Sequence, residues 1–113
     1  MQRLAYGLIL VSTSALFAQN ASLQGVVKDS SEAMISGANV TAVNLDTGLR
    51  RETPTNESGL YVFPSLPVGR YKLTAASQGF SSSEVAELKL DVNQSARLDF
   101  VLKPGAVTES VTV

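Results

Sequence analysis

The side chains that most enzymes use for nucleophilic and metal chemistry are missing from this chain. Its 113 residues include no histidine and no cysteine. Without them the chain has no thiol nucleophile, no serine–histidine pair, no disulfide bond and no ordinary zinc site. The sequence therefore predicts a protein that is not an enzyme, with no catalytic residue, no cofactor and no metal.

Three carboxylates, those of Asp29, Glu32 and Asp46, come nearest to a metal-binding group. Calcium sites take carboxylate oxygens, but a calcium loop supplies them at short, regular intervals. The intervals here match no such loop, and we interpret the three residues as solvated turn residues. The formal net charge of −1 also gives no reason to expect binding to nucleic acid.

Three aromatic residues, Tyr61, Phe63 and Tyr71, form the other group whose spacing could serve a ligand. The face of an aromatic ring can stack on a sugar, and such a platform would bind carbohydrate. All three residues, however, fall on alternating positions of expected strands, which is typical of residues that face a core. We predict that they are buried, and sugar stacking is the alternative.

The N-terminus differs in composition from the rest. A basic start over residues 1–3 precedes a mostly apolar run over residues 4–18. This run is short for a membrane-spanning helix, which needs about 20 residues, and its flanks are typical of a secretory signal peptide. We predict a signal peptide over residues 1–21, cleaved after Ala18 or, alternatively, after Ala21; an uncleaved anchor helix is the other interpretation. Export without cysteine favours the periplasm or outer membrane of a Gram-negative-type bacterium.

Short β-prone runs make up the remainder, separated by clusters of Gly, Pro, Asn, Asp and Ser. No run has the 3.6-residue apolar period of a helix. We expect an all-β, small Greek-key sandwich of about seven strands. The expected strands cover 22–29, 39–46, 49–55, 60–63, 71–75, 86–92 and 96–102, the last two forming an antiparallel hairpin. The charges of Arg50, Arg51 and Glu52 and the missing N–H group of Pro54 predict that 49–55 is an edge strand.

Alternation along these runs also predicts the core. Pro64 and Pro67 cannot donate ladder hydrogen bonds, so we expect a corner there, with Leu66 tucked beneath the sheet. Val92 is expected to face inward. In 39–46, the change of face between Ala42 and Val43 suggests a bulge or a strand buried on both sides. The predicted core residues are Tyr61, Phe63, Tyr71, Leu73, Leu90, Leu98 and Phe100.

The order of these motifs over residues 22–103 resembles the carboxypeptidase regulatory-like domain, a prealbumin-like β-sandwich. The residues that carry the resemblance are Gly37, Ala38, Val40, Gly59, Tyr61, Phe63, Leu66, Pro67, Gly69, Tyr71, Gly79 and Phe80. The resemblance implies a non-catalytic accessory module with a carbohydrate-binding-like fold. It transfers no ligand residue to this chain.

A signal peptide, this module and the tail over 104–113 together resemble the N-terminus of TonB-dependent outer-membrane receptors, especially the Oar-like group. The resemblance implies a periplasmic accessory or interaction domain, and a chain that is a truncated N-terminal piece of a receptor. Implied partners are TonB and the receptor's own plug or barrel. A carbohydrate-binding module and a structural surface domain are the alternatives.

The tail contains a segment similar to the TonB box, the coupling segment of these receptors. The matching residues, which we predict to bind the partner, are Glu109, Ser110, Val111 and Val113. A nearly uncharged β-prone segment can add as an edge strand to another protein's sheet. A tail without fixed structure, or a last strand of the sandwich itself, is the alternative.

Overall fold

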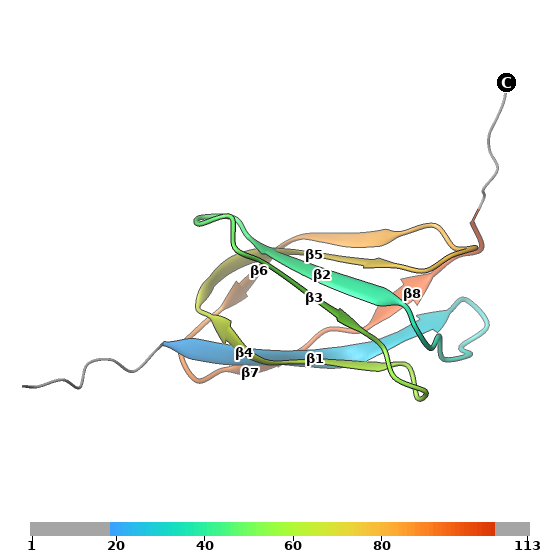
Figure 1. Ribbon diagram of the computed structural model, residues 1–113, viewed down its shortest axis with the longest axis horizontal. Coiled ribbons are helices and arrows are strands. Elements are labelled where there is room, and N and C mark those ends of the chain that lie inside the picture. The colour runs from blue at the N-terminus through green and yellow to red at the C-terminus, as the bar shows by residue number, and fades with distance from the viewer. Residues whose placement is uncertain (1–18, 106–113) are drawn as a thin grey trace, which may run out of the picture.

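The computed structural model describes residues 19–105. Within this range it has eight β-strands in two sheets and no helix (Figure 1). The expected all-β sandwich is confirmed, with eight strands instead of about seven because the last expected strand is divided in two. The described range accordingly contains no helix able to cross a membrane.

The first sheet is built around β1 (Asn20–Asp29). On one side β1 pairs antiparallel with β4 (Leu60–Pro67). On the other side it pairs in parallel first with β7 (Ser95–Arg97) and then with β8 (Phe100–Leu102). Because β1 has a neighbour on both sides, it is the central strand of this sheet.

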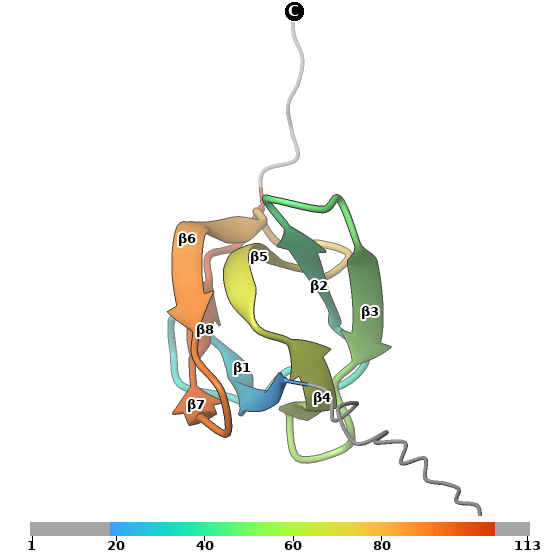
Figure 2. The ribbon, with the colours of Figure 1, turned by 90° about the vertical axis from the view of Figure 1, so that its left-hand side faces the viewer.

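The second sheet is antiparallel throughout. Its strands lie in the order β3 (Arg50–Pro54), β2 (Asn39–Asn44), β5 (Gly69–Ala76) and β6 (Ser83–Leu90). Figure 2 looks along the sandwich and shows this sheet opposite the first. Hairpins connect β2 to β3 and β5 to β6 within this sheet. The chain passes from one sheet to the other at the connections β1–β2, β3–β4, β4–β5 and β6–β7.

The predicted hairpin between 86–92 and 96–102 is wrong. β6 pairs with β5 in one sheet, while β7 and β8 pair with β1 in the other. The turn around Asn93 carries the chain across the sandwich, and Val92, expected inside, is 51% exposed. Alternation specifies which face of a strand is buried but not which strand lies beside it, so the pattern was compatible with both arrangements.

The proline corner is also different from the expectation, because β4 continues through Pro64 to Pro67. The pairing with β1 shifts between Phe63, opposite Leu23, and Leu66, opposite Ala21. This shift leaves one extra residue on β4, which is a β-bulge. The bulge lets Phe63 and Leu66 both face the core, and burial of Leu66 is confirmed.

The core fills the space between the two sheets. Six of the seven predicted core residues are buried, and Leu98 is partly buried against them. The expected change of face in 39–46 does not occur, because β2 ends at Asn44 and Leu45 lies exposed in the following turn. Leu66 is buried as well, as are Ala75 and Leu102, which alternation also places inside. Further buried hydrophobic residues, beyond those expected, are Ala21, Leu23, Val27, Ile35, Ala38, Val40 and Ala42.

Candidate functional site

The three aromatic rings that could have formed a sugar platform lie in the core. Tyr61, Phe63 and Tyr71 are each no more than 4% exposed. The rings of Tyr61 and Phe63 meet edge to face with their centroids 5.9 Å apart. No ring face of these three residues is open to solvent, so they cannot stack on a carbohydrate.

Both buried tyrosine hydroxyls are used within the fold. The hydroxyl of Tyr61 donates to the carbonyl oxygen of Leu98 at 2.6 Å, and that of Tyr71 donates to the carbonyl oxygen of Pro67 at 2.6 Å. Burial, with a further contribution from the charge of Asp99, raises the pKa of Tyr61 well above its ordinary value. Such a phenol remains protonated at neutral pH, and its role is to hold the first sheet together.

The three carboxylates considered as metal ligands are not brought together. Asp29 ends β1, and Glu32 lies in the turn that follows. Asp46 lies in the turn after β2, at the opposite end of the sandwich, next to Arg70 near the start of β5. Between residues 19 and 105 no group of three potential metal-ligating side chains occurs.

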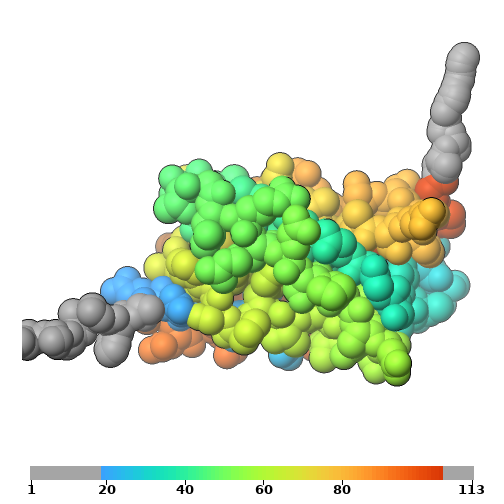
Figure 3. Space-filling model, in the orientation of Figure 1, coloured from blue at the N-terminus to red at the C-terminus, as the bar shows by residue number. Residues whose placement is uncertain are grey.

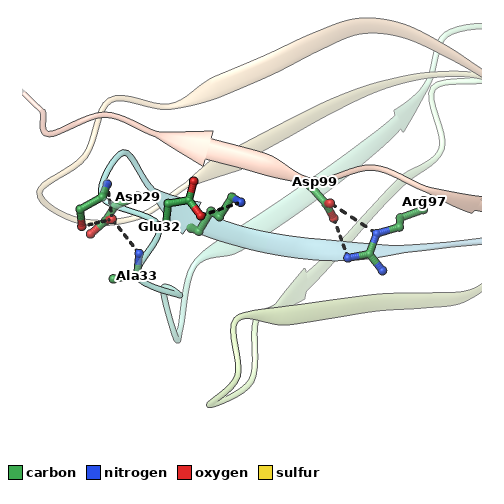
Figure 4. A network of polar contacts seen from close by, with 7 residues as sticks. Asp29, Glu32, Ala33, Arg97 and Asp99 are labelled. Atoms are coloured by element: carbon green, nitrogen blue, oxygen red, sulfur yellow. Dashed lines mark hydrogen bonds and ion pairs between the residues drawn. The ribbon is translucent and has the colours of Figure 1, made fainter.

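Each of the two aspartates serves its own turn or strand. One oxygen of Asp29, Oδ1, accepts hydrogen bonds from the amides of Ser31 and Ala33 at 2.8 and 3.0 Å and from the Ser31 hydroxyl at 2.7 Å (Figure 4). The Ser31 hydroxyl has the largest effect in holding the pKa of Asp29 below its ordinary value. Asp46 binds Arg70 at 2.6 Å, and this hydrogen bond lowers the pKa of Asp46.

A second polar group, not identified from the sequence, joins β1 to the divided last strand. The carboxylate of Asp99 accepts a hydrogen bond from the amide of Val26 at 3.0 Å and pairs with Arg97 at 3.2 Å (Figure 4). At Gly25 the segment around Leu98 comes so close that an added Cβ would lie 1.8 Å from the carbonyl oxygen of Leu98. A glycine inside a strand can mark such a close approach of two backbones. Gly25 was therefore the feature of the sequence that could have pointed to this contact.

The edges of both sheets are poor templates for another strand. β3 has the exposed charges of Arg50, Arg51 and Glu52 and ends at Pro54, as the sequence indicated. β4 has its bulge and two prolines, and β6 has a register shift opposite β5 between Tyr71 and Leu73. The remaining edge consists of β7 and β8, which have three residues each. Interruptions and charges of this kind discourage strand addition.

Residues in the described range 19–105 line a larger and a smaller polar hollow on the surface. The larger, of about 540 Å³, is lined by Ser36, Thr55, Asn56, Glu57 and Ser58. It lies where the loop after β1 meets the turn before β4. Figure 3 shows these two segments, in teal and light green, at the right-hand end of the molecule. Asn56 and Thr55 already serve the fold, because Asn56 accepts hydrogen bonds from Ser58 N and Leu60 N and Thr55 bonds to Ile35.

The smaller hollow, of about 180 Å³, lies on the outer face of the second sheet. Two cations, Arg50 and Lys72, line it together with Thr41, Val43 and Thr74. Arg50 is paired with Glu52 at 2.7 Å, which offsets one of the positive charges. The predicted partner-binding residues Glu109, Ser110, Val111 and Val113 lie outside the described residues.

A comparison with protein families matches residues 22–103 to the carboxypeptidase regulatory-like domain. Among curated proteins, the chain is 30% identical over 105 residues to the TonB-dependent transporter Oar of Myxococcus xanthus. This match covers 92% of the chain but only 10% of the transporter. The region of similarity is therefore a small part of a much longer protein.

Solved structures share the fold at low sequence identity. The TIE protein of Bacillus anthracis has a TM-score of 0.63 at 21% identity, covering 75% of this chain and 17% of that one. A protein of Bacteroides uniformis described as carbohydrate-binding has a TM-score of 0.62 at 16% identity, with 78% and 43% covered. The 3-chlorocatechol 1,2-dioxygenase of Rhodococcus opacus has a TM-score of 0.62 at 10% identity, and the match covers 83% of this chain and 64% of that one. These similarities show the fold alone.

Proposed function

The chain belongs to the carboxypeptidase regulatory-like domain family, and from this premise we propose that it is a non-catalytic accessory domain of a TonB-dependent outer-membrane receptor. The observation that carries the proposal is the similarity of this domain to part of a TonB-dependent transporter. The domain lies in the periplasm, at the N-terminal end of the receptor, and interacts with the receptor's own plug or barrel.

The shape of the described domain supports a role between two other segments. β1 and β8 run in parallel, with Asp29 opposite Leu102. The chain therefore enters the sandwich at one end and leaves it at the other (Figure 1). A folded unit with its ends so placed separates the segments before and after it by its own length.

The non-catalytic part of the proposal is supported by the bonding of the polar groups. Asp29, Asp46 and Tyr61 each have structural partners within the fold. We expect no peptidase turnover from purified residues 19–105 with peptide substrates. Turnover that disappeared on substitution of a single carboxylate would contradict this expectation.

The receptor assignment is tested by the coding sequence that follows Val113. A plug and a large barrel encoded in frame, or immediately downstream after an interruption, are the expected finding. An unrelated downstream gene, found also in related genomes, would contradict the assignment. This observation separates an accessory domain from the alternative of a structural surface domain.

The partner is proposed to be TonB, bound through the segment with Glu109, Ser110, Val111 and Val113. Strand addition needs backbone N–H groups, and proline removes one of them. A pull-down with the TonB C-terminal domain should retain the chain and lose the Val111→Pro variant. The matched control is Val107→Pro, which lies before the segment and should still be retained. Equal retention of all three proteins would remove the coupling proposal.

Carbohydrate binding is the second candidate function, and the polar hollow near Glu57 is the observation that favours it. With the three core rings buried, a sugar would have to be held by hydrogen bonds at this hollow. A glycan array with the purified protein tests the idea directly. Binding that is lost in a Glu57→Ala, Ser58→Ala variant would support it, and an array without signal would contradict it.

A further inference from the structure

Residues just after the apolar N-terminal run are bonded into the folded domain. The carbonyl oxygen of Gln19 accepts a hydrogen bond from the amide of Val68 at 3.0 Å. The carbonyl oxygen of Asn20 accepts one from the amide of Asn93 at 2.9 Å. The side-chain amide of Asn20 also donates to the hydroxyl of Ser65. These bonds connect the start of β1 to β4, to the residue after it and to the turn before β7.

Burial changes sharply over the same residues. Gln19 is exposed, Asn20 is half-buried, and Ala21 is only 4% exposed and lies opposite Leu66. Ser22 is again half-buried, and its amide donates to the carbonyl oxygen of Gln94 at 2.9 Å. Within the stretch 19–22, Gln19 is the one exposed residue, and a charge at the start of the chain is most easily hydrated there.

Cleavage of a signal peptide is a hydrolysis that creates such a charge. Water adds to the carbonyl carbon of the residue before the cut, the peptide C–N bond breaks, and the next residue receives an ammonium group. A charged group that is buried without a partner is costly. A cut that began the mature chain at Ala21 would place the ammonium group on a residue that is only 4% exposed.

We propose that the processing site is the Ala18–Gln19 bond, so that the mature chain keeps the whole of β1. This proposal rests on the proposed function, because signal peptidase cuts only a chain that is exported. Ala18 provides the small residue that signal peptidase requires before the cut. A cut after Ala21, the other site indicated by the sequence, would remove the carbonyl acceptors of Val68 and Asn93 and the buried Ala21 methyl group.

The first test follows the full chain in a Gram-negative host. N-terminal sequencing and intact mass of the envelope fraction should give a chain that begins at Gln19, allowing for cyclisation of the terminal glutamine. An exported chain that begins at Asn20, Ala21 or Ser22 would overturn this proposal alone. A precursor confined to the cytoplasm with Met1 intact would overturn the proposed export as well.

Substitution of the residue before the cut gives a second readout. Ala18→Leu places a bulky side chain where the enzyme needs a small one, and we expect the precursor to accumulate. The matched control is Ala5→Leu, the same change within the apolar run, which should be processed at the normal rate. Normal processing of Ala18→Leu would overturn the proposal.

A third readout concerns the fold. Purified proteins that begin at Gln19 and at Ser22, released from a cleavable fusion, differ only in the three residues of the contested segment. We expect the melting temperature of the shorter protein to be lower by at least about 4 °C, since a change of 1 kcal/mol has roughly this effect in a domain of this size. Equal melting temperatures would remove the structural reason for the assignment.

Discussion

At the scale of single residues, the groups that could do chemistry are used by the fold. The hydroxyl of Tyr61 donates a hydrogen bond to a backbone carbonyl across the first sheet. Asp29 accepts hydrogen bonds from the turn that follows it, and Asp46 forms an ion pair with an arginine. The side chains with the greatest effect on the protein are therefore expected to act on stability. Phe63 and Asp29 give the sharpest tests, one in the core and one on the surface.

Replacement of Phe63 by Ala should destabilise the domain by roughly 3–5 kcal/mol, because a buried ring is lost and a cavity remains. This is a large part of the stability of a small domain. Urea unfolding followed by circular dichroism measures the change. The control is Val62→Ala, on the outward face of the same strand, which should change stability by less than about 1 kcal/mol. Equal effects of the two substitutions would mean that Phe63 is not a core residue.

Asp29 should contribute to a loss of stability in acid. Its pKa in the folded protein lies below the ordinary value of 3.8, chiefly because of the Ser31 hydroxyl, so its contribution is present at neutral pH. The contribution is lost as the pH falls below about 4 and the carboxylate is protonated. In Asp29→Asn the side-chain oxygen still accepts the turn hydrogen bonds but has no charge to lose. Melting temperatures measured between pH 6 and pH 2 should therefore fall less in the variant, and parallel curves would contradict the assignment.

At the scale of elements, the bulge in β4 decides which side chains reach the core. Phe63 and Leu66 are three positions apart, yet both face inward because one extra residue lies between the pairs of the register. A regular strand with the same sequence would turn one of them outward. The bulge also lies on an edge strand. Its two prolines cannot donate ladder hydrogen bonds, and an edge strand tolerates this because one of its sides has no neighbouring strand.

Deletion of Ser65 should therefore destabilise the domain less than deletion of Val62. Without Ser65, Phe63 and Leu66 are two positions apart, so both still face the core of a regularly paired β4. Without Val62, which lies in the regular part of β4, Tyr61 and Phe63 become adjacent and one of them must leave the core, at a cost of about 3–5 kcal/mol for one large side chain. Thermal unfolding compares the two variants, and Ser65→Ala is the control for the lost hydroxyl contact with Asn20. Equal losses from the two deletions would show that β4 contains no extra residue at the bulge.

At the scale of the whole molecule, the two sheets share one core. Residues from β1, β2, β4, β5, β6 and β8 meet in it, and the chain changes sheet repeatedly along its length. Neither sheet has a buried face without the other. The interrupted edges described above also leave little regular backbone for pairing with a second copy.

Residues 19–105 should consequently unfold in one cooperative transition, as single small domains do. Tyrosine fluorescence reports on Tyr61 and Tyr71 in the two different sheets, and circular dichroism reports on all strands. The two signals should give the same urea midpoint. A midpoint for the backbone signal well above that for the rings would mean that one sheet survives without the other.

The sequence by itself determined the fold class and most of the core. Alternation placed Tyr61, Phe63, Tyr71, Leu73, Leu90 and Phe100 inside, and all six are buried. The proline and charges of 50–54 indicated an edge strand, which β3 is. The family was also evident from local motifs, because turn glycines and alternating aromatics are fixed by short-range backbone geometry.

Tertiary structure alone decided which strands became neighbours. The alternation of 86–92 and 96–102 suits a hairpin as well as it suits two separate sheets, and only the packing of both sheets selected the second arrangement. The same holds for Gly25, whose importance arises from a chain segment more than 70 positions away, at Leu98. Local periodicity contains no information about such partners, because it describes one strand's faces and not the strand that will lie beside it.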